Sequence, residues 1–383
     1  MNLEVVHNLE DRRLCQWNEL LLDAQNPMPF QKYEWAVSWW QNFSTDKDKL
    51  LIILAYEDKE LVGIAPLMYR VNMSYTAIKF IGSGYFDYFD FIVKKGKGPE
   101  VINGIAETLK INFPCFEWAL SNIPEESDTF KILKQSSSFD VLSFFHDIVP
   151  CIDLPDTKEK FYYQVKGGLR WDISRRERRL RESGEVEFKA CNNIAEAREL
   201  LEDFFSLHIK KWESVNGYSA FKFENMRRFM RAILEKLFPD KTINLYYILH
   251  GRAKIIAICP AFELGGKFIF YTHAYDPDFA RCSPGKVLIS KLINYSIDKQ
   301  YREFDFGIGK EAYKLEWPCK TKQLFDIYLF NNKDTLLNCY LKCRRRLAAL
   351  YLLLILPMMR RFRPVVYTWR MIRRRRGQYA RFQ

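Results

Sequence analysis

The sequence predicts an α+β protein with two domains, each built on a mostly antiparallel sheet flanked by helices. The chain has 383 residues, which is more than one domain of ordinary size usually contains. Hydrophobic residues make up 48% and aromatic residues 16%, a composition typical of packed cores rather than of disorder. Both halves run from helix-like segments into segments that alternate apolar and polar residues, although no strict sequence repeat links them.

The first half begins with two helices that carry tryptophan anchors. It continues with "KLLIILAYEDKELVGIAPLMYRV", which indicates two strands joined by the polar turn 57–60. "AIKFIGSGYFDYFDFIV" then alternates apolar residues around a Gly-Ser-Gly turn. The expected helices span 12–24, 31–43, 99–111 and 127–135, and a further strand spans 116–121.

The segment "VPCIDLPD" (149–156) is punctuated by proline and predicts a domain boundary. We therefore expect domains at 1–148 and 149–334, followed by a basic tail at 335–383. In the second domain the expected helices span 158–183, 194–213, 223–238 and 284–299. The expected strands span 185–190, 242–249, 254–263, 267–275, 302–308 and 322–330.

The net charge of +12 belongs to the tail. Residues 335–383 contain 13 Lys or Arg and no acidic residue, so residues 1–334 are close to neutral. An apolar run at 347–359 lies between the arginine clusters and is too short to span a membrane. This pattern predicts an interfacial anchor on an anionic membrane through residues 336–383, with nucleic-acid binding as the rival and a cap on the catalytic domain as the structural alternative.

The nine cysteines show no metal-type spacing, so no metal site is expected. The first residues, "MNLEVVHNLEDRR", contain no apolar signal region. We therefore expect a cytoplasmic protein with reduced thiols, peripheral on the inner face of the membrane.

Two neighbouring features of the second half suggest a ligand site. In "YTHAYDPDFARCSPGKVL" a strand leads through a loop into a helix that begins at Ser283-Pro284. Such a helix start binds phosphate well, and Gly285 would allow close approach; an ordinary capped helix is the alternative. The second feature is "FDFGIGKEAYKLEW", in which an expected strand ends in two glycines before Tyr313.

Together these segments resemble the C-terminal signature of the CelD-like group of GNAT acyltransferases, relatives of the FemABX aminoacyltransferases. The resemblance extends to "GLRWDISRRERRL", "FFSLHIKKW", "LVGIAPLMY" and "IGSGYFDYFDFI", and thus covers roughly residues 30–330. It implies two tandem GNAT-like folds with acyl-CoA, in the form of acetyl-CoA, as a co-substrate on the second copy and no permanently bound cofactor. The implied donor-binding residues are Arg281, Ser283, Gly285, Lys286 and Val287. The loop contains one glycine where the general GNAT phosphate loop has more.

The resemblance also implies catalytic roles. Tyr313 would protonate the departing thiolate, and His273 would accept the amine proton unless it is merely packed. Asp305 would bind the acceptor or orient the base, and an ion pair with Lys314 is the structural alternative. The expected acceptor-binding residues are Asp87, Tyr88, Arg170, Arg175, His208, Trp212, Tyr275, Lys314 and Trp317. For His208 and Trp212 the alternative is packing, and for the arginines it is a solvated helix face.

The function that follows is an N-acyltransferase that moves an acyl group from acyl-CoA to an amine. A small-molecule or lipid-linked amino sugar of envelope or polysaccharide synthesis is the expected acceptor. One alternative is a FemABX-like enzyme that uses aminoacyl-tRNA, the one hypothesis with a nucleic-acid partner. The other is a non-catalytic, membrane-associated partner with a GNAT fold.

Overall fold

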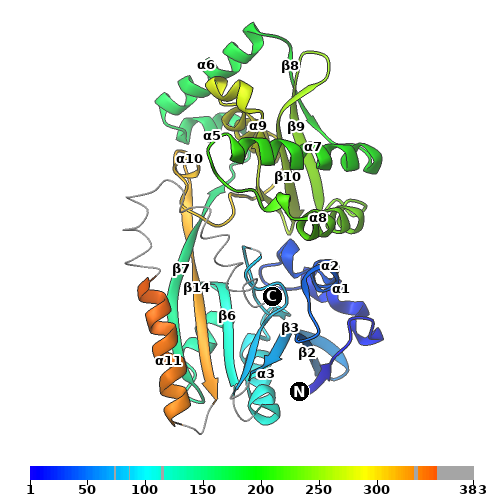
Figure 1. The fold of residues 1–383 in the computed structure, drawn as a ribbon, viewed down its shortest axis with the longest axis vertical. Coiled ribbons are helices and arrows are strands. Elements are labelled where there is room, and N and C mark those ends of the chain that lie inside the picture. The colour runs from blue at the N-terminus through cyan, green and yellow to red at the C-terminus, as the bar shows by residue number, and fades with distance from the viewer. Residues whose placement is uncertain (73–74, 86, 114–115, 332–334, 352–383) are drawn as a thin grey trace. The chain divides into compact units, whose positions relative to one another are not determined.

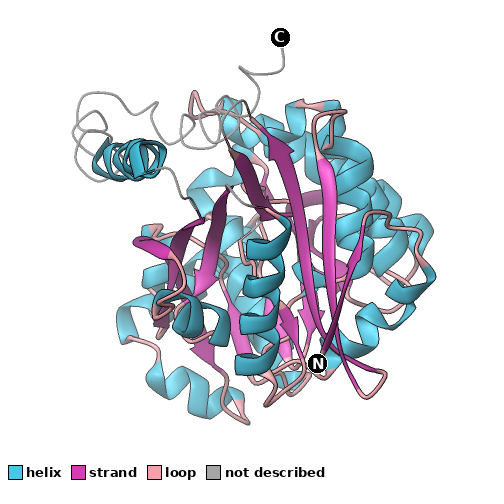
Figure 2. Cartoon of the chain, turned by 90° about the horizontal axis from the view of Figure 1, so that it is seen from below, coloured by secondary structure: helices cyan, strands magenta, loops and turns pink. Residues whose placement is uncertain are grey.

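The computed structural model describes residues 1–72, 75–85, 87–113, 116–331 and 335–351. The chain forms two compact units: unit 1 comprises Met1–Asp147 and the chain from Gln323 onward, and unit 2 comprises Ile148–Lys322. The chain leaves unit 1 within strand β7 (Asp140–Asp153) and returns within strand β14 (Lys320–Asn331). Each unit combines strands with helices packed against them, so the predicted α+β class is confirmed (Figures 1 and 2).

Unit 1 is built on a sheet with the strand order β1-β2-β3-β4-β6-β14-β7. Strands β2 and β3 form the predicted hairpin, and its turn residues Asp58 and Lys59 both have positive φ, as a type I′ turn requires. Strand β4 runs parallel to β6, and the short strand β5 extends the pairing along β3. The elements of unit 1 besides β7 and β14 are β1 (Asn2–Val6), η1 (Arg12–Gln16), α1 (Trp17–Leu22), η2 (Pro29–Gln31), α2 (Tyr33–Phe43), β2 (Lys49–Glu57), β3 (Glu60–Val71), β4 (Thr76–Phe80), β5 (Ile92–Val93), α3 (Gly98–Asn112), β6 (Phe116–Pro124), α4 (Asp128–Lys134) and α11 (Thr335–Leu350).

Unit 2 is built on strands in the order β7-β13-β11-β10-β9-β8. Strand β11 runs parallel to β13, and the short strand β12 continues the pairing along β10. The elements of unit 2 besides β7 and β14 are α5 (Lys158–Gln164), α6 (Gly167–Glu182), β8 (Val186–Ala190), α7 (Ile194–Glu213), η3 (Ala220–Lys222), α8 (Glu224–Leu237), β9 (Ile243–His250), β10 (Lys254–Leu264), β11 (Lys267–Ile269), β12 (Ala274–Tyr275), η4 (Pro277–Cys282), α9 (Pro284–Asp298), β13 (Glu303–Asp305) and α10 (Ala312–Leu315).

The two units repeat one topology. In unit 1 an antiparallel pair is followed by an interrupted strand, a helix and a strand parallel to the first fragment: β2, β3, β4 with β5, α3 and β6. In unit 2 the same order is made by β9, β10, β11 with β12, α9 and β13. The predicted tandem organisation is therefore present in the topology, although the sequences of the halves show no strict repeat.

The core of unit 2 forms where amphipathic helices meet the sheet. Helix α8 buries Met226, Phe229, Met230, Ile233, Leu234 and Leu237, the spacing of one helical face. On β13, Phe304 is buried in the same apolar cluster as Leu288 and Leu292 of α9. This packing fixes the start of α9 relative to the ends of β11 and β13.

Four expectations need correction. The chain passes from unit 1 to unit 2 between Asp147 and Ile148, next to the expected boundary, but the proline-punctuated segment 149–156 is mostly strand, because Cys151 and Ile152 are buried and pair with β13 as part of β7. The expected helix 158–183 is two helices, α5 and α6, separated at residues 165–166. The expected strand 267–275 is interrupted at 270–273.

The fourth correction concerns the strand expected at 322–330 in the second sheet. Strand β14 pairs with β6 of unit 1 from Leu324 to Asn331, so the end of the predicted catalytic domain belongs to the other unit. The first part of the predicted tail is helix α11, and the rest of the tail, including most of the apolar run, lies outside the described residues. No helix in the described part of the chain is long and apolar enough to cross a membrane.

Candidate active site

A break in the sheet of unit 2 creates the candidate site. Strand β11 ends at Ile269, and the N–H of Phe270 donates to the carbonyl of Asp305 on β13, 2.8 Å away. Beyond this bond residues 270–273 leave the sheet, and pairing resumes at Ala274 along β10. The backbone N–H of His273 has no hydrogen-bond acceptor within the described part of the chain, so a free donor lies at the break.

The ring of His273 lies against the start of helix α9. A Cβ atom added to Gly285 would lie 2.8 Å from His273 Nε2, so only glycine leaves space for the ring there. The ring of Tyr275 stacks on His273 at a centroid distance of 6.3 Å, and Tyr313 meets it edge-on at 5.6 Å. The structure therefore brings together four of the predicted residues, His273, Tyr275, Gly285 and Tyr313.

His273 also contacts a lysine that the sequence reasoning missed. Lys211 Nζ lies 3.5 Å from His273 Nε2 and 3.3 Å from its carbonyl oxygen, and it lies over the ring of Tyr275. Burial lowers the pKa of Lys211 to about 8. Burial, and then the charge of Lys211, lowers the pKa of His273 well below its usual range, so this imidazole is neutral near pH 7.

A signal for Lys211 was present in the sequence. It follows His208 by three residues on a helix, so the two share a face, and that helix had been singled out for His208 and Trp212. Those two residues bond to each other: Trp212 Nε1–H donates to His208 Nε2 at 3.2 Å. The proton of His208 is then on Nδ1, which donates to Ser219 Oγ at 2.8 Å, and burial lowers the pKa of His208 to about 3. Neither ring nitrogen of His208 is left for a substrate.

The start of α9 meets the basic helix α6 (Figure 1). Ser283 precedes the helix in the left-handed conformation, and its Oγ does not cap the helix but accepts from Arg176 Nη1 at 2.5 Å. Lys286 Nζ pairs with Asp172 of α6 at 3.2 Å and with Glu316 at 2.6 Å. The basic helix α6 and the start of α9, which are far apart in the sequence, therefore form one charged cluster.

Asp172 is the acidic centre of this cluster. It also pairs with Arg175 at 2.9 Å and with Arg176 at 2.7 Å. Burial opposes its ionisation, but hydrogen bonds from Arg176, Arg175 and Lys286 outweigh that effect and hold the pKa of Asp172 well below its usual range. Arg175 Nε is buried without a hydrogen-bond partner in the described part of the chain. The cluster thus holds three cations around one carboxylate, and the N–H group at Arg175 Nε is available for a further hydrogen bond.

The remaining predicted donor residues differ in exposure. Arg281, just before the helix, is exposed, whereas Val287 is fully buried in the core and has only its backbone near the helix start. Pro284 occupies the first position of α9, as expected.

Asp305 lies at the end of β13, fully buried. Its Oδ1 accepts a hydrogen bond from the N–H of Gly307 at 2.7 Å. Burial lowers the pKa of Lys267, and the negative charge of Asp305 partly opposes that shift. Lys314 is also buried, but its Nζ pairs with Glu311 at 3.0 Å and donates to the carbonyl of Ile308. The ion pair that the structure gives to Lys314 is therefore with Glu311.

The remaining predicted acceptor residues are described within their own units. Trp317 is a core residue that stacks on Phe161, and Arg170 is exposed on α6. Asp87 and Tyr88 belong to unit 1, where the ring of Tyr88 stacks on Phe30.

The comparisons with known proteins bear on this same region. Residues 168–315 match the family model described as "Acetyltransferase (GNAT) domain", and this range contains His273, Tyr275, Gly285 and Tyr313. These residues form a GNAT acyltransferase domain. Over these residues the GNAT resemblance of the sequence is confirmed, and N-acyl transfer is the activity that such a domain supports.

Solved structures agree on the fold. FemX superposes with a TM-score of 0.61 at 12% identity, over 86% of this chain and 98% of FemX. A conserved protein of unknown function from Bacteroides thetaiotaomicron gives 0.55 at 12% identity, over 85% of this chain and all of that one (100%). The C-terminal domain of a protein assigned as a lysylphosphatidylglycerol synthetase from Agrobacterium fabrum gives 0.52 at 11% identity, over 82% and 90%. No curated protein matches the sequence significantly.

Proposed function

We propose that this GNAT protein transfers an acyl group, acetyl in the simplest case, from acyl-CoA to the amine of an amino sugar or envelope precursor. The observation that carries the proposal is the convergence of His273, Gly285 and Tyr313 at the break between β11 and β12. A reactive carbonyl placed at this break would meet the free N–H of His273, which can stabilise an oxyanion.

The side chains suit the steps of the transfer. The amine nitrogen forms a bond to the thioester carbon, and the bond from carbon to sulfur breaks. The neutral imidazole of His273 accepts the proton that the amine loses, and the hydroxyl of Tyr313 gives its proton to the thiolate. Lys211 supplies a positive charge beside the developing negative charge.

The basic cluster at α9 suits the pyrophosphate of the donor. The backbone N–H of Gly285 and the positive end of the helix dipole lie at this start, where Lys286 and Arg176 are also held, and the exposed Arg281 precedes the helix by three residues. The unused Nε of Arg175 is a further donor. Asp172 would exchange part of its ion pairs for those to the incoming anion.

A second donor, aminoacyl-tRNA, has its own support. The likeness to FemX extends over nearly both whole chains, and the name of the Agrobacterium fabrum protein indicates transfer of a lysyl group. Asp172 already neutralises part of the positive charge of Arg175, Arg176 and Lys286. Less of that charge is then left for a pyrophosphate, which favours an acyl donor that is not held at this cluster by a pyrophosphate.

Helix α11 supports action at the inner face of an anionic membrane. Leu336, Tyr340, Leu347 and Leu350 are exposed at intervals that keep them near one helix face, and the rest of the basic tail follows. We expect the full chain to sediment with vesicles that contain phosphatidylglycerol and to stay free of phosphatidylcholine vesicles. Leu347→Glu should weaken the binding, and unchanged binding would remove α11 from the proposal.

A turnover assay separates the two donors. The full chain is incubated with glucosamine and a panel of other amines, once with radiolabelled acetyl-CoA and once with radiolabelled lysyl-tRNA. We expect transfer from acetyl-CoA, with Tyr313→Phe as the control of strongly reduced activity. Transfer from lysyl-tRNA alone would establish the second donor, and transfer from neither by folded protein would favour a non-catalytic role.

A further inference from the structure

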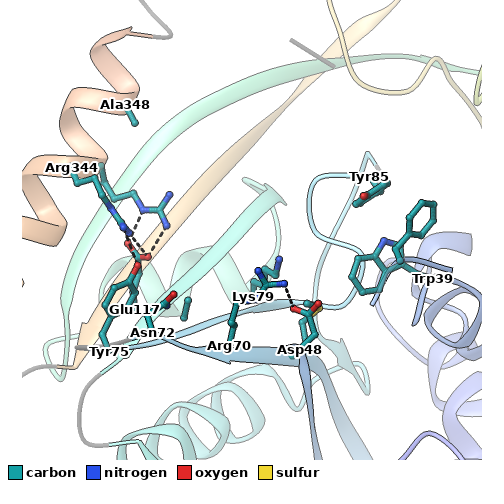
Figure 3. Close-up of a pocket in the computed structure, with 14 residues that line it drawn as sticks. Trp39, Asp48, Arg70, Asn72, Tyr75, Lys79, Tyr85, Glu117, Arg344 and Ala348 are labelled. Atoms are coloured by element: carbon teal, nitrogen blue, oxygen red, sulfur yellow. Dashed lines mark hydrogen bonds and ion pairs between the residues drawn. The ribbon is translucent and has the colours of Figure 1, made fainter. Parts of the chain in front are cut away.

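Unit 1 contains a cavity of about 360 Å³ that shares no residue with the candidate active site of unit 2. Its floor is made by strands β3, β4 and β6, and its walls come from the end of α2 and from α11 (Figure 3). This volume lies within the range of sites that hold small molecules.

The strand register explains the hollow floor. Arg70 on β3 lies opposite Ala77 on β4, which lies opposite Glu117 on β6. The methyl group of Ala77 therefore leaves space between a long cation and a long anion. In the next row Lys79 lies opposite Met68, so its ammonium group reaches the same hollow.

Lys79 is the unusual member of this floor. It has no hydrogen bond or ion pair to any residue that the structure describes, although its neighbours are paired. Burial lowers the pKa of Lys79, the carboxylate of Asp48 opposes that shift, and Arg70 adds to it. The residue is half-buried, and an ammonium group partly withdrawn from water without a partner gains from an anionic ligand.

The other charged side chains of the cavity all take part in ion pairs. Asp48 binds Arg70 at 2.8 Å. The fully buried Glu117 binds Arg344 at 2.8 Å and Arg345 at 2.7 Å, both from α11. Four cationic side chains therefore face two carboxylates, which leaves an excess of about two positive charges when Lys79 is protonated.

An aromatic wall stands opposite the arginines of α11. The rings of Phe43 and Tyr85 lie 4.5 Å apart, and Trp39 meets Tyr85 at 5.8 Å. The indole Nε1 of Trp39 is buried and has no acceptor in the described part of the chain. Figure 3 shows Lys79, Arg70 and Asp48 between this wall and Arg344.

We propose that this cavity is a second ligand site that binds a phosphate monoester attached to a ring, specifically a nucleoside monophosphate. A phosphate monoester carries about −1.5 to −2 charges at pH 7, which matches the excess of positive charge. Its oxygens accept hydrogen bonds from Lys79 and from N–H groups of Arg344 and Arg345. The base packs on the aromatic wall, where ring stacking stabilises it further.

The test measures ligand binding to the full chain by calorimetry with three probes, AMP, glucose 6-phosphate and inorganic phosphate. AMP is expected to bind most tightly, inorganic phosphate most weakly. Lys79→Met removes the charge at nearly constant length and should weaken AMP binding at least tenfold. Ala77→Leu fills the hollow without changing charge and should abolish it. Lys95→Met, at an exposed lysine of the same unit, is the matched control and should bind as the wild type does.

Thermal unfolding without ligand provides the second readout. Lys79→Met is expected to unfold at a temperature equal to or above that of the wild type, because a half-buried charge without a partner is removed. A marked loss of stability would show that Lys79 serves the fold and would overturn the proposal. Failure of folded wild type to bind any of the three probes, or equal binding by Lys79→Met and Lys95→Met, would also overturn it. None of these outcomes depends on acyl transfer by unit 2.

Discussion

At the scale of single residues, His273 shows how packing selects a protonation state. Its ring is held by Gly285, Tyr275 and Tyr313, and the ammonium group of Lys211 lies beside Nε2. Burial and that positive charge keep the imidazole neutral, so the ring retains a lone pair near pH 7. A neutral imidazole can accept a proton from an amine but cannot serve as the acid for the thiolate.

We propose Tyr313 as the acid for the thiolate, and removal of its hydroxyl gives the first prediction. Tyr313→Phe keeps the ring against His273 and removes the hydroxyl. We expect kcat to fall about 100-fold, the scale of general-acid catalysis, with little change in donor KM. Steady-state kinetics with acetyl-CoA measure this. Tyr163→Phe, at a tyrosine that is 89% exposed, is the matched control. Equal activity of the two variants would contradict the assignment.

The lowered pKa of Lys211 predicts that the rate of acyl transfer depends on pH. Its pKa of about 8 means that the charged form predominates below pH 8 and is lost above it. If the charge assists transfer, kcat/KM of the wild type falls above pH 8. Lys211→Arg keeps its charge at higher pH, so its activity should persist there.

The control for this profile is Lys210→Arg. Lys210 pairs with Asp276 and Asp278, and hydrogen bonds to these carboxylates raise its pKa. This variant should retain the wild-type alkaline limb. An alkaline limb in Lys211→Arg that coincides with that of the wild type would assign the limb to another group.

At the scale of elements, the break between β11 and β12 depends on the contact of His273 with α9. A Cβ atom at position 285 would lie 2.8 Å from Nε2 and 3.0 Å from Cδ2 of His273. We expect Gly285→Ala to lower the free energy of unfolding by about 1–3 kcal/mol, measured by urea denaturation.

The same substitution in a His273→Ala background should cost little, because the clashing ring is absent. Gly168→Ala in α6 is the matched control, since nothing lies within 4 Å of its added Cβ atom, and helix propensity alone should act there. An equal cost of Gly285→Ala in both backgrounds would show that the contact with His273 is not its cause.

The elements also show what sequence can predict. Helix α7 has the expected bounds, 194–213, because its apolar spacing and its Asn193 cap are local signals. The interruption at 270–273 was missed, because residues 267–275 keep an apolar pattern while the break is set by pairing with β10 and β13. Lys211 was missed because its burial depends on His273 and Tyr275, about sixty residues further along the chain.

At the scale of the whole molecule, the chain uses one topology twice with different side chains at the break. The interruption between β4 and β5 corresponds to that between β11 and β12. Composition and pattern were sufficient to predict two α+β halves, and the motifs pointed to the second as the site of chemistry. Local sequence patterns could not predict the strand pairs and ion pairs between residues that are far apart in the sequence.

Helix α11 is the clearest case of such a pairing. Its arginines appeared in the sequence as an unopposed cluster, but Arg344 and Arg345 bind Glu117, more than 200 residues earlier, and Lys342 binds Asp140. Part of the positive charge of the tail is therefore used within unit 1, where it also forms a wall of the proposed phosphate site.

The central claim is that unit 2 binds acyl-CoA with its phosphates at the start of α9, and calorimetric titration of acetyl-CoA into the full chain tests it most directly. We predict micromolar binding by the wild type. Arg281→Glu, which changes an exposed side chain, should weaken it at least tenfold, and Arg252→Glu, at an exposed arginine in the β9–β10 turn, should not. No binding by folded protein, or equal binding by both variants, would contradict the claim.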